Sequence, residues 1–251
     1  MIHNIDCEFI ANFTNTVTKN RIRDSVVWDQ YPRPKLLFWG DETGDDSRIF
    51  AKTLRKTAES VGIDVVDSSS RGGICGYVSF DKTRPTFADE DIDGSLNLDG
   101  GPGTPYKKAV VEATMAVIDR LITSKKGDHV LVIGRSETIG RAVAKCLLDD
   151  DKTVTVAHSK TGNERLRSLI SRADIVVSTA PYGTTFPGKW LHNEQILIDV
   201  GNNFNLDYWK CINFGSITAT PKVGGVGAIT RAIIVDRLVD NYESRLVKEL
   251  S

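Results

Sequence analysis

Residues 127–161 read GDHVLVIGRSETIGRAVAKCLLDDDKTVTVAHSKT. The apolar run 129–133 is short and rich in β-branched residues, which is typical of a strand buried on both faces. A glycine turn follows at once, and Gly140 opens a segment whose apolar residues recur at helical spacing. After an acidic break, a second apolar run covers residues 154–157. This order of strand, glycine turn, helix and strand predicts the first βαβ unit of a dinucleotide-binding fold.

The glycine turn has the spacing Gly-x-Ser-x-x-x-Gly from Gly134 to Gly140. Gly134 allows a tight turn, and Gly140 lets the helix and the strand approach each other closely. The free N–H groups and the positive dipole at the start of the helix can hold a pyrophosphate, and Ser136 adds a phosphate donor. The pattern is weak by itself, but it stands between a predicted strand and a predicted helix, as a nucleotide site requires.

The end of the second strand indicates which dinucleotide binds. An NAD site usually presents Asp or Glu there, where the carboxylate bonds the ribose 2′-hydroxyl. Here the strand is followed by HSKT, residues 158–161, which offers hydrogen-bond donors and no carboxylate. Arg135 lies in the glycine turn, close to where a 2′-phosphate would be, and arginine suits phosphate groups. We therefore predict NADP as the cofactor; the alternative is that Arg135 and Lys160 are solvated loop charges.

Composition excludes several classes of protein. The 251 residues are 40% hydrophobic and 26% charged, which is ordinary for a globular protein of one large or two modest domains. The net charge of −1 gives no overall electrostatic reason to bind nucleic acid or an anionic membrane. No run approaches the roughly twenty apolar residues of a membrane helix. The four cysteines are scattered, which indicates free thiols in a reducing compartment, so we expect the cytoplasm.

The histidines give no indication of a metal site. His3, His129 and His192 have no cysteine or carboxylate partners at ligand spacing. We therefore expect no bound metal.

The rest of the chain alternates short apolar runs with segments of helical spacing, which predicts an α/β protein with a doubly wound parallel sheet. Helices are expected over about residues 10–22, 47–61, 106–122, 164–170 and 229–247. Strands are expected over residues 35–39, 63–66, 74–80, 174–179 and 196–200.

We divide the chain into a smaller α/β substrate domain, residues 1–122, and a Rossmann-type NAD(P)-binding domain, residues 123–251, with a cleft between them. The last helix is a candidate to pack back on the first domain.

Four segments carry further information when they are taken together: VIGRS (132–136) with Gly140, HSKT (158–161), DVG (199–201) and GGVGAITRA (224–232). Two weaker landmarks are DIDG (91–94) and PGTP (102–105). Together they resemble the methylenetetrahydrofolate dehydrogenase/cyclohydrolase family. The resemblance covers essentially all of residues 100–240, and segment 224–232 is its most specific part.

The resemblance implies a homodimeric two-domain enzyme that holds folate in the cleft, with the nicotinamide of NADP facing the folate one-carbon unit. In that chemistry the cofactor accepts a hydride from the methylene carbon, and the protein supplies position and electrostatics. The residues implied to bind the cofactor are Gly134, Arg135, Ser136, Gly140, His158, Ser159, Thr179, Gly201 and Thr230. Those implied to bind the substrate are Phe50, Asp93, Gly225 and Gly227.

Asp93 is also the catalytic candidate, since it would hold the amide and amine edge of the pterin. The alternative is an ordinary Asp-Gly turn.

The family's catalytic helix departs from the pattern in this chain. The family carries a tyrosine followed four residues later by a lysine, and the matching positions here are Phe50 and Leu54. The lysine shuttles a proton and activates water in the cyclohydrolase step, which leucine cannot do. Lys52 and Lys56 each lie two residues from position 54, about 200° around a helix, and should face away from the cleft that position 54 is expected to face. The family's glutamine is also missing from the segment 77–82, YVSFDK.

Three hypotheses follow. The first is an NADP-dependent dehydrogenase or reductase that resembles methylenetetrahydrofolate dehydrogenase and lacks cyclohydrolase activity. The second is a reductase of another C=N or iminium substrate, and the third is an NADP-binding regulator without turnover. The Rossmann half would look the same in all three, since only the cleft differs. Each requires a small-molecule ligand, and none requires nucleic acid or a membrane.

Overall fold

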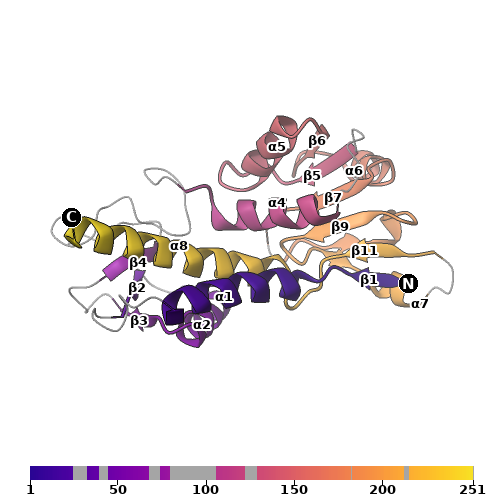
Figure 1. The fold of residues 1–251 in the computed structure, drawn as a ribbon. Coiled ribbons are helices and arrows are strands. Elements are labelled where there is room, and N and C mark those ends of the chain that lie inside the picture. Colours follow the sequence, from indigo (N-terminus) through magenta and orange to yellow (C-terminus); the bar gives the residue numbers. More distant parts are fainter. Residues whose placement is uncertain are drawn as a thin grey trace. The chain divides into compact units, whose positions relative to one another are not determined.

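The computed structural model describes residues 1–24, 33–39, 45–67, 74–79, 106–121, 129–181, 183–211 and 215–250. The chain packs as two units, which are described separately (Figure 1). The six-stranded unit comprises Met1–Glu8 and Val110–Ala228, and the three-stranded unit comprises Phe9–Ala109 and Ile229–Ser251. By packing, most of helix α4 (Ala109–Leu121) therefore belongs to the six-stranded unit. A functional boundary after residue 122 stays a prediction.

The six-stranded unit is built on a parallel sheet with the strand order β1-β11-β9-β7-β5-β6. Its strands are β1 (Ile2–Asn4), β5 (His129–Ile133), β6 (Thr153–Ala157), β7 (Ile175–Ser178), β9 (Ile196–Asp199) and β11 (Ile217–Ala219). Each central strand is short and apolar, and β7 is buried along its whole length because both faces of the sheet are covered.

The register of these strands decides where a ligand can bind. Ile133 of β5 is level with Ala157 of β6 and with Ser178 of β7. Ser178 is in turn level with Asp199 of β9. The carboxyl ends of four neighbouring strands therefore meet at one edge, which is where open α/β sheets bind ligands.

Helices α5 (Gly140–Asp149) and α6 (Asn163–Ile170) connect β5 to β6 and β6 to β7. The remaining elements are β8 (Phe186–Pro187) paired with β10 (Phe204–Asn205), the 3-10 helix η2 (Gly188–Trp190) and helix α7 (Asp207–Cys211). The core of the unit includes Leu131, Leu166, Val176, Leu197 and Ile217, all at most 5% exposed. This core fixes the strand ends that form the site.

The three-stranded unit has a parallel sheet in the order β3-β2-β4. Its strands are β2 (Lys35–Trp39), β3 (Asp64–Val66) and β4 (Ile74–Ser79). Its helices are α1 (Cys7–Asp24), α2 (Asp45–Ser60) and α8 (Val226–Leu250), and α1 and α8 begin in the six-stranded unit. Residues of β2, α2 and α8 share one apolar core, so the last helix packs against the sheet formed early in the chain.

Polar contacts join α1 to α8, which lie beside each other in Figure 1. The guanidinium of Arg21 pairs with Asp236 at 3.0 Å, with Asp240 at 2.7 Å and with Glu243 at 2.6 Å. Single exposed ion pairs contribute little, but one arginine shared among three carboxylates forms a network. This network fixes α1 against α8 within the three-stranded unit.

The expected elements are present, with two kinds of difference. Strands β1 and β11 complete one edge of the large sheet, and neither was expected from the sequence. Helix α4 begins at Ala109 instead of Tyr106, and α8 begins three residues early, at Val226. Thr104 and Pro105, the expected start of the first of these helices, lie outside the described residues. In the part of the chain that the structure describes, no helix combines the length and apolarity needed to cross a membrane.

Candidate dinucleotide-binding site

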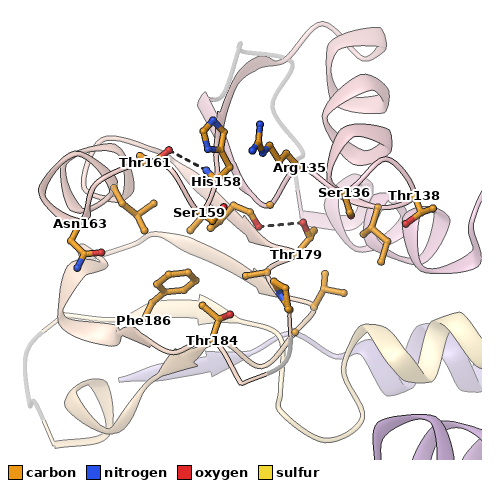
Figure 2. Close-up of a pocket in the computed structure, with 18 residues that line it drawn as sticks. Arg135, Ser136, Thr138, His158, Ser159, Thr161, Asn163, Thr179, Thr184 and Phe186 are labelled. Atoms are coloured by element: carbon orange, nitrogen blue, oxygen red, sulfur yellow. Dashed lines mark hydrogen bonds between the residues drawn. The ribbon is translucent and has the colours of Figure 1, made fainter. Parts of the chain in front are cut away.

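A cavity of about 680 Å³ opens at the carboxyl ends of β5, β6, β7 and β9 (Figure 2). This volume is in the range of small-molecule and cofactor sites. The predicted cofactor residues that line it are Gly134, Arg135, Ser136, His158, Ser159, Thr179 and Gly201. Each of them directly follows one of the four strands, so the sheet register brings together residues that lie up to 67 positions apart in the sequence.

The glycine turn can only be built from glycines. Gly134 has a φ of +130°, a conformation that side chains disfavour, and a Cβ there would collide with Thr179 Oγ1. Gly140 is not in the cavity lining, but a Cβ on it would collide with the carbonyl oxygen of Gly134. The two glycines therefore let the start of α5 approach the end of β5, as the sequence pattern predicts.

Ser136 positions the start of α5. The backbone N–H of Gly140 donates to Ser136 Oγ at 3.2 Å, and the N–H of Arg141 donates to the Ser136 carbonyl at 2.9 Å. A hydroxyl that accepts one bond still has its own hydrogen to donate. Ser136 can therefore cap the helix and donate to a phosphate at the same time.

The segment after β6 presents donors to the cavity. The backbone N–H of Lys160 donates to His158 Nδ1 at 3.2 Å, and the N–H of His158 donates to Thr161 Oγ1 at 3.1 Å. Because Nδ1 accepts a hydrogen bond, the neutral ring carries its proton on Nε2 and can donate it. His158 is thus a donor beside the cavity.

Arg135 projects from the end of β5, next to the strand that leads to His158 (Figure 2). Its side chain is exposed, and no carboxylate pairs with its guanidinium among the described residues. A cation and neutral donors therefore lie together at the mouth of the cavity. This chemistry suits an anion such as a phosphate.

Thr179 and Asp199 hold the strand ends in place. Both the N–H and the hydroxyl of Thr179 donate to the Ile133 carbonyl, at 2.8 and 3.2 Å. The Asp199 carboxylate accepts the N–H groups of Asn203 and Phe204, each at 2.8 Å. Burial raises the pKa of Asp199, and these hydrogen bonds oppose that rise. Asp199 therefore acts as a structural acceptor below the cavity.

Several lining residues had no signal in the sequence. They are Asn163, Leu166, Pro181, Thr184 and Phe186; Pro181 and Thr184 lie between β7 and β8, and Phe186 begins β8. The ring of Phe186 lies 5.2 Å from the ring of Phe204, between centroids, with the two planes inclined at 49°. Leu166, Pro181 and Phe186 give part of the cavity an apolar surface that can pack against a flat ring.

The remaining cofactor and substrate candidates lie near the start of α8. Gly225 precedes the helix, and its carbonyl accepts the N–H of Ala228 at 2.9 Å. Gly227 is in the first turn. Thr230 follows in the three-stranded unit and is 4% exposed. Their roles stay predictions.

On α2 the structure corrects one expectation. Leu54 was expected to face a substrate cleft, but it is 0% exposed and lies in the apolar core of the three-stranded unit. A leucine has no polar head to direct outward, so it packs with its apolar neighbours. Phe50 is partly buried and packs against the same core. Lys52 and Lys56 are exposed, on the side of α2 opposite Leu54, as the helical spacing predicts.

Asp93 and residues 80–82 lie outside the described residues, so the catalytic candidate and the end of the segment that lacks the family's glutamine stay predictions. In the described ranges, no three His, Cys, Asp or Glu side chains gather in an arrangement that could hold a metal ion.

Comparison with known proteins gives consistent matches. Residues 108–246, more than half of the chain, match the family model described as tetrahydrofolate dehydrogenase/cyclohydrolase, NAD(P)-binding domain. The chain is 30% identical over 226 residues to bifunctional protein FolD 1 of Salinispora arenicola, which covers 80% of this chain and 78% of the relative. It is 28% identical over 277 residues to FolD of Caldanaerobacter subterraneus, covering 95% of this chain and 96% of the relative.

Two solved structures share the fold. One is methylenetetrahydrofolate dehydrogenase-cyclohydrolase of Trypanosoma brucei with NADP and an inhibitor, with a TM-score of 0.75 and 19% identity over 97% of this chain and 98% of that chain. The other is the NAD-dependent 5,10-methylenetetrahydrofolate dehydrogenase of Saccharomyces cerevisiae, with a TM-score of 0.72 and 15% identity over 98% of this chain and 99% of that chain. At these identities the likeness establishes the two-domain α/β fold.

Proposed function

Because the chain belongs to the tetrahydrofolate dehydrogenase/cyclohydrolase family, we propose that it is an NADP-dependent 5,10-methylenetetrahydrofolate dehydrogenase without cyclohydrolase activity. Membership of this family makes the chain an oxidoreductase that binds NAD(P). The observation that carries the finer proposal is Leu54, a fully buried apolar side chain at the position of the family's proton-shuttling lysine. The cavity of the same chain keeps its glycine turn and its phosphate donors.

The residues around the cavity fit a dinucleotide. The glycine turn brings the start of α5 close to the strand end, where its N–H groups and the Ser136 hydroxyl can hold a pyrophosphate. When it is bound, the nicotinamide ring supplies a hydride acceptor for the methylene carbon of the folate. The protein contributes alignment, because Thr179 joins the ends of β7 and β5 and Asp199 holds the turn that follows β9.

The choice of NADP rests on charge. The exposed guanidinium of Arg135, Ser159 and the Nε2–H of His158 offer donors for a 2′-phosphate. No carboxylate follows β6 to bond a ribose 2′-hydroxyl. A charge-assisted contact from arginine favours NADP over NAD, because only NADP carries the extra phosphate.

The loss of cyclohydrolase activity follows from proton chemistry. Hydrolysis of the methenyl product needs a group that removes a proton from water, and Leu54 has none. Lys52 and Lys56 each lie two residues from position 54, so neither occupies the position of the family's lysine. Hydride transfer does not need this proton shuttle, so the two activities of the family can separate.

A second candidate function is reduction of a different C=N or iminium substrate. It is favoured by the change at position 50, where Phe50 keeps an aromatic ring but has no hydroxyl to contact a pterin. In both cases we propose a small-molecule ligand, a homodimer and a cytoplasmic setting.

Calorimetric titration of the purified protein with NADP, NAD and tetrahydrofolate tests the proposal. We expect NADP to bind more tightly than NAD, and tetrahydrofolate to bind in the presence of NADP. Clear NADP binding without any folate binding would replace the dehydrogenase proposal with the second candidate function. Absence of NADP binding would overturn both.

A further inference from the structure

Asn203, four residues after β9, connects the turn after that strand to the end of β7 and to the residues that follow β7. It is 0% exposed. Its Oδ1 accepts the hydroxyl of Ser178 at 2.8 Å, and its Nδ2 donates to the carbonyls of Pro181 and Thr184, each at 3.1 Å. Neither Asn203 nor Ser178 lines the cavity within the described ranges. A buried amide with this many satisfied bonds fixes the segments that it joins.

The orientation of this amide follows from chemistry. Backbone carbonyls can only accept hydrogen bonds, so the NH2 group must face Pro181 and Thr184. The oxygen of the amide then faces Ser178, whose hydroxyl can donate. No other assignment satisfies all three bonds, and an aspartate at this position could not make the two donations.

The segment held in this way is one wall of the cavity. Pro181, Thr184 and Phe186 all line the cavity, and Figure 2 shows Thr184 and Phe186 together on one side of it. The backbone N–H of Phe186 also donates to the carbonyl of Asn203, at 2.6 Å. Side chain and backbone of one residue thus hold this wall at three points.

Asn203 is itself held rigidly. Its N–H donates to Asp199, which also accepts the N–H of Phe204. A Cβ on Gly201 would lie 2.5 Å from Asn203 Oδ1 and 2.5 Å from the Ala180 carbonyl oxygen. Gly201, which lines the cavity, is therefore the residue type that leaves room for the asparagine beneath it.

We propose that Asn203 is a positioning residue for the dinucleotide: it holds the wall residues Pro181, Thr184 and Phe186 where the bound nucleotide contacts them. It does so without touching the ligand. The inference rests on the proposed function, since it assumes that the cavity binds NADP. The position of the wall then depends on one buried amide, which Ser178 orients and which donates to two backbone carbonyls of the wall.

Two variants test this. Asn203→Asp removes both donations and places a carboxylate against two carbonyls, so we expect the Kd for NADP to rise roughly tenfold or more in folded protein. Ser178→Ala removes only the bond that orients the amide, and we expect a rise of about threefold. In both variants the KM for NADP should rise while kcat stays near the wild-type value, because the wall lies outside the reacting atoms.

Ile217→Ala is the matched control. Ile217 is 1% exposed in the core of the same unit and is not a cavity residue, so its truncation should lower the unfolding midpoint and leave the Kd for NADP unchanged. If Asn203→Asp does not fold, the Kd for NADP of Ser178→Ala alone tests the inference. A Kd for the folded variants equal to that of the wild type, or an equal rise in Ile217→Ala, would overturn the inference. Wild-type protein that binds no NADP would instead overturn the proposed function, and this inference with it.

Discussion

The two units of this chain differ in how far their key positions tolerate a change of residue. In the six-stranded unit, the residues at the strand ends are constrained by the backbone: Gly134 and Gly140 have no space for a side chain. In the three-stranded unit, position 54 carries a leucine that completes the apolar core. Under the proposed function, cofactor binding depends on backbone packing that tolerates little change, whereas the side chain at position 54 can change without loss of the fold. We propose that this difference lets the chain keep a cofactor site and lose one of the family's two reactions.

The largest expected effect is on stability, in the three-stranded unit. Leu54→Lys would place an ammonium group in a core where Leu54 is 0% exposed, so we expect the free energy of unfolding to fall by about 3 kcal/mol or more. Hydrolytic activity should not be restored. Leu54→Met, which conserves volume, should cost less than about 1.5 kcal/mol. Chemical denaturation measures both, and a stable Leu54→Lys protein that hydrolyses methenyltetrahydrofolate would show that position 54 reaches a cleft after all.

The second-largest expected effect distinguishes folate binding from NADP binding. If Asp93 holds the pterin, Asp93→Ala should abolish detectable folate binding, a loss on the order of 2–4 kcal/mol, because two N–H donors lose their acceptor. NADP affinity should stay within about twofold of the wild type, since we predict that Asp93 belongs to the substrate domain and the cofactor motif to the NAD(P)-binding domain. Calorimetry with each ligand distinguishes the cases. Equal losses for folate and NADP would indicate a damaged fold and no pterin contact.

In the six-stranded unit, the next prediction concerns Arg135 and the 2′-phosphate of NADP. Arg135→Ala should weaken NADP binding by about 1.5–3 kcal/mol, roughly one to two decades in Kd, and should change NAD binding little. Fluorescence or calorimetric titration with both cofactors provides the comparison. Arg141→Ala is a suitable control, because Arg141 is exposed in the first turn of α5, does not line the cavity and, among the described residues, pairs only with Glu137, at 3.4 Å. Equal losses for NADP and NAD in Arg135→Ala would contradict the 2′-phosphate assignment.

The smallest expected effect is a dependence on pH. Burial raises the folded-state pKa of Asp199 above its unfolded value, so its contribution to stability is fully present below the unfolded pKa, near 4, and is lost as the pH rises through the folded pKa. The stability of the wild type relative to Asp199→Asn should therefore decrease as the pH rises from the acid range toward neutrality. Denaturation curves at several pH values test the sign. An increase over the same range would mean that the hydrogen bonds from Asn203 and Phe204 outweigh burial.

The sequence predicts what depends on local pattern. The short apolar runs and the glycine turn between β5 and α5 identify the parallel sheet and the edge where the cavity lies. The local sequence does not predict strand β1, because its three residues, Ile-His-Asn, form a strand only by pairing with β11, more than 200 positions later. The stability of β1 comes from its pairing with β11, so the sequence of β1 alone does not reveal it.

The candidate site is predictable to a similar degree. Cofactor residues that directly follow strands are found by their position, whereas Pro181 and Thr184 lie between β7 and β8, where the Asn203 side chain donates to their carbonyls. The sequence does not reveal such bonds, because every residue carries the same backbone carbonyl. The burial of Leu54 cannot be predicted either, because helical spacing shows which residues share a face of α2 but not what packs against that face.

The most direct test of the account follows both reactions of the family in one assay. Purified protein is incubated with 5,10-methylenetetrahydrofolate and NADP, and the absorbances of NADPH and of the methenyl product are recorded together. We expect NADPH and methenyltetrahydrofolate to form in equal amounts, and the methenyl product then to decay no faster than in buffer without protein. Formation of NADPH with rapid, protein-dependent loss of the methenyl product would contradict it, because it would show that the cyclohydrolase reaction survives without the lysine.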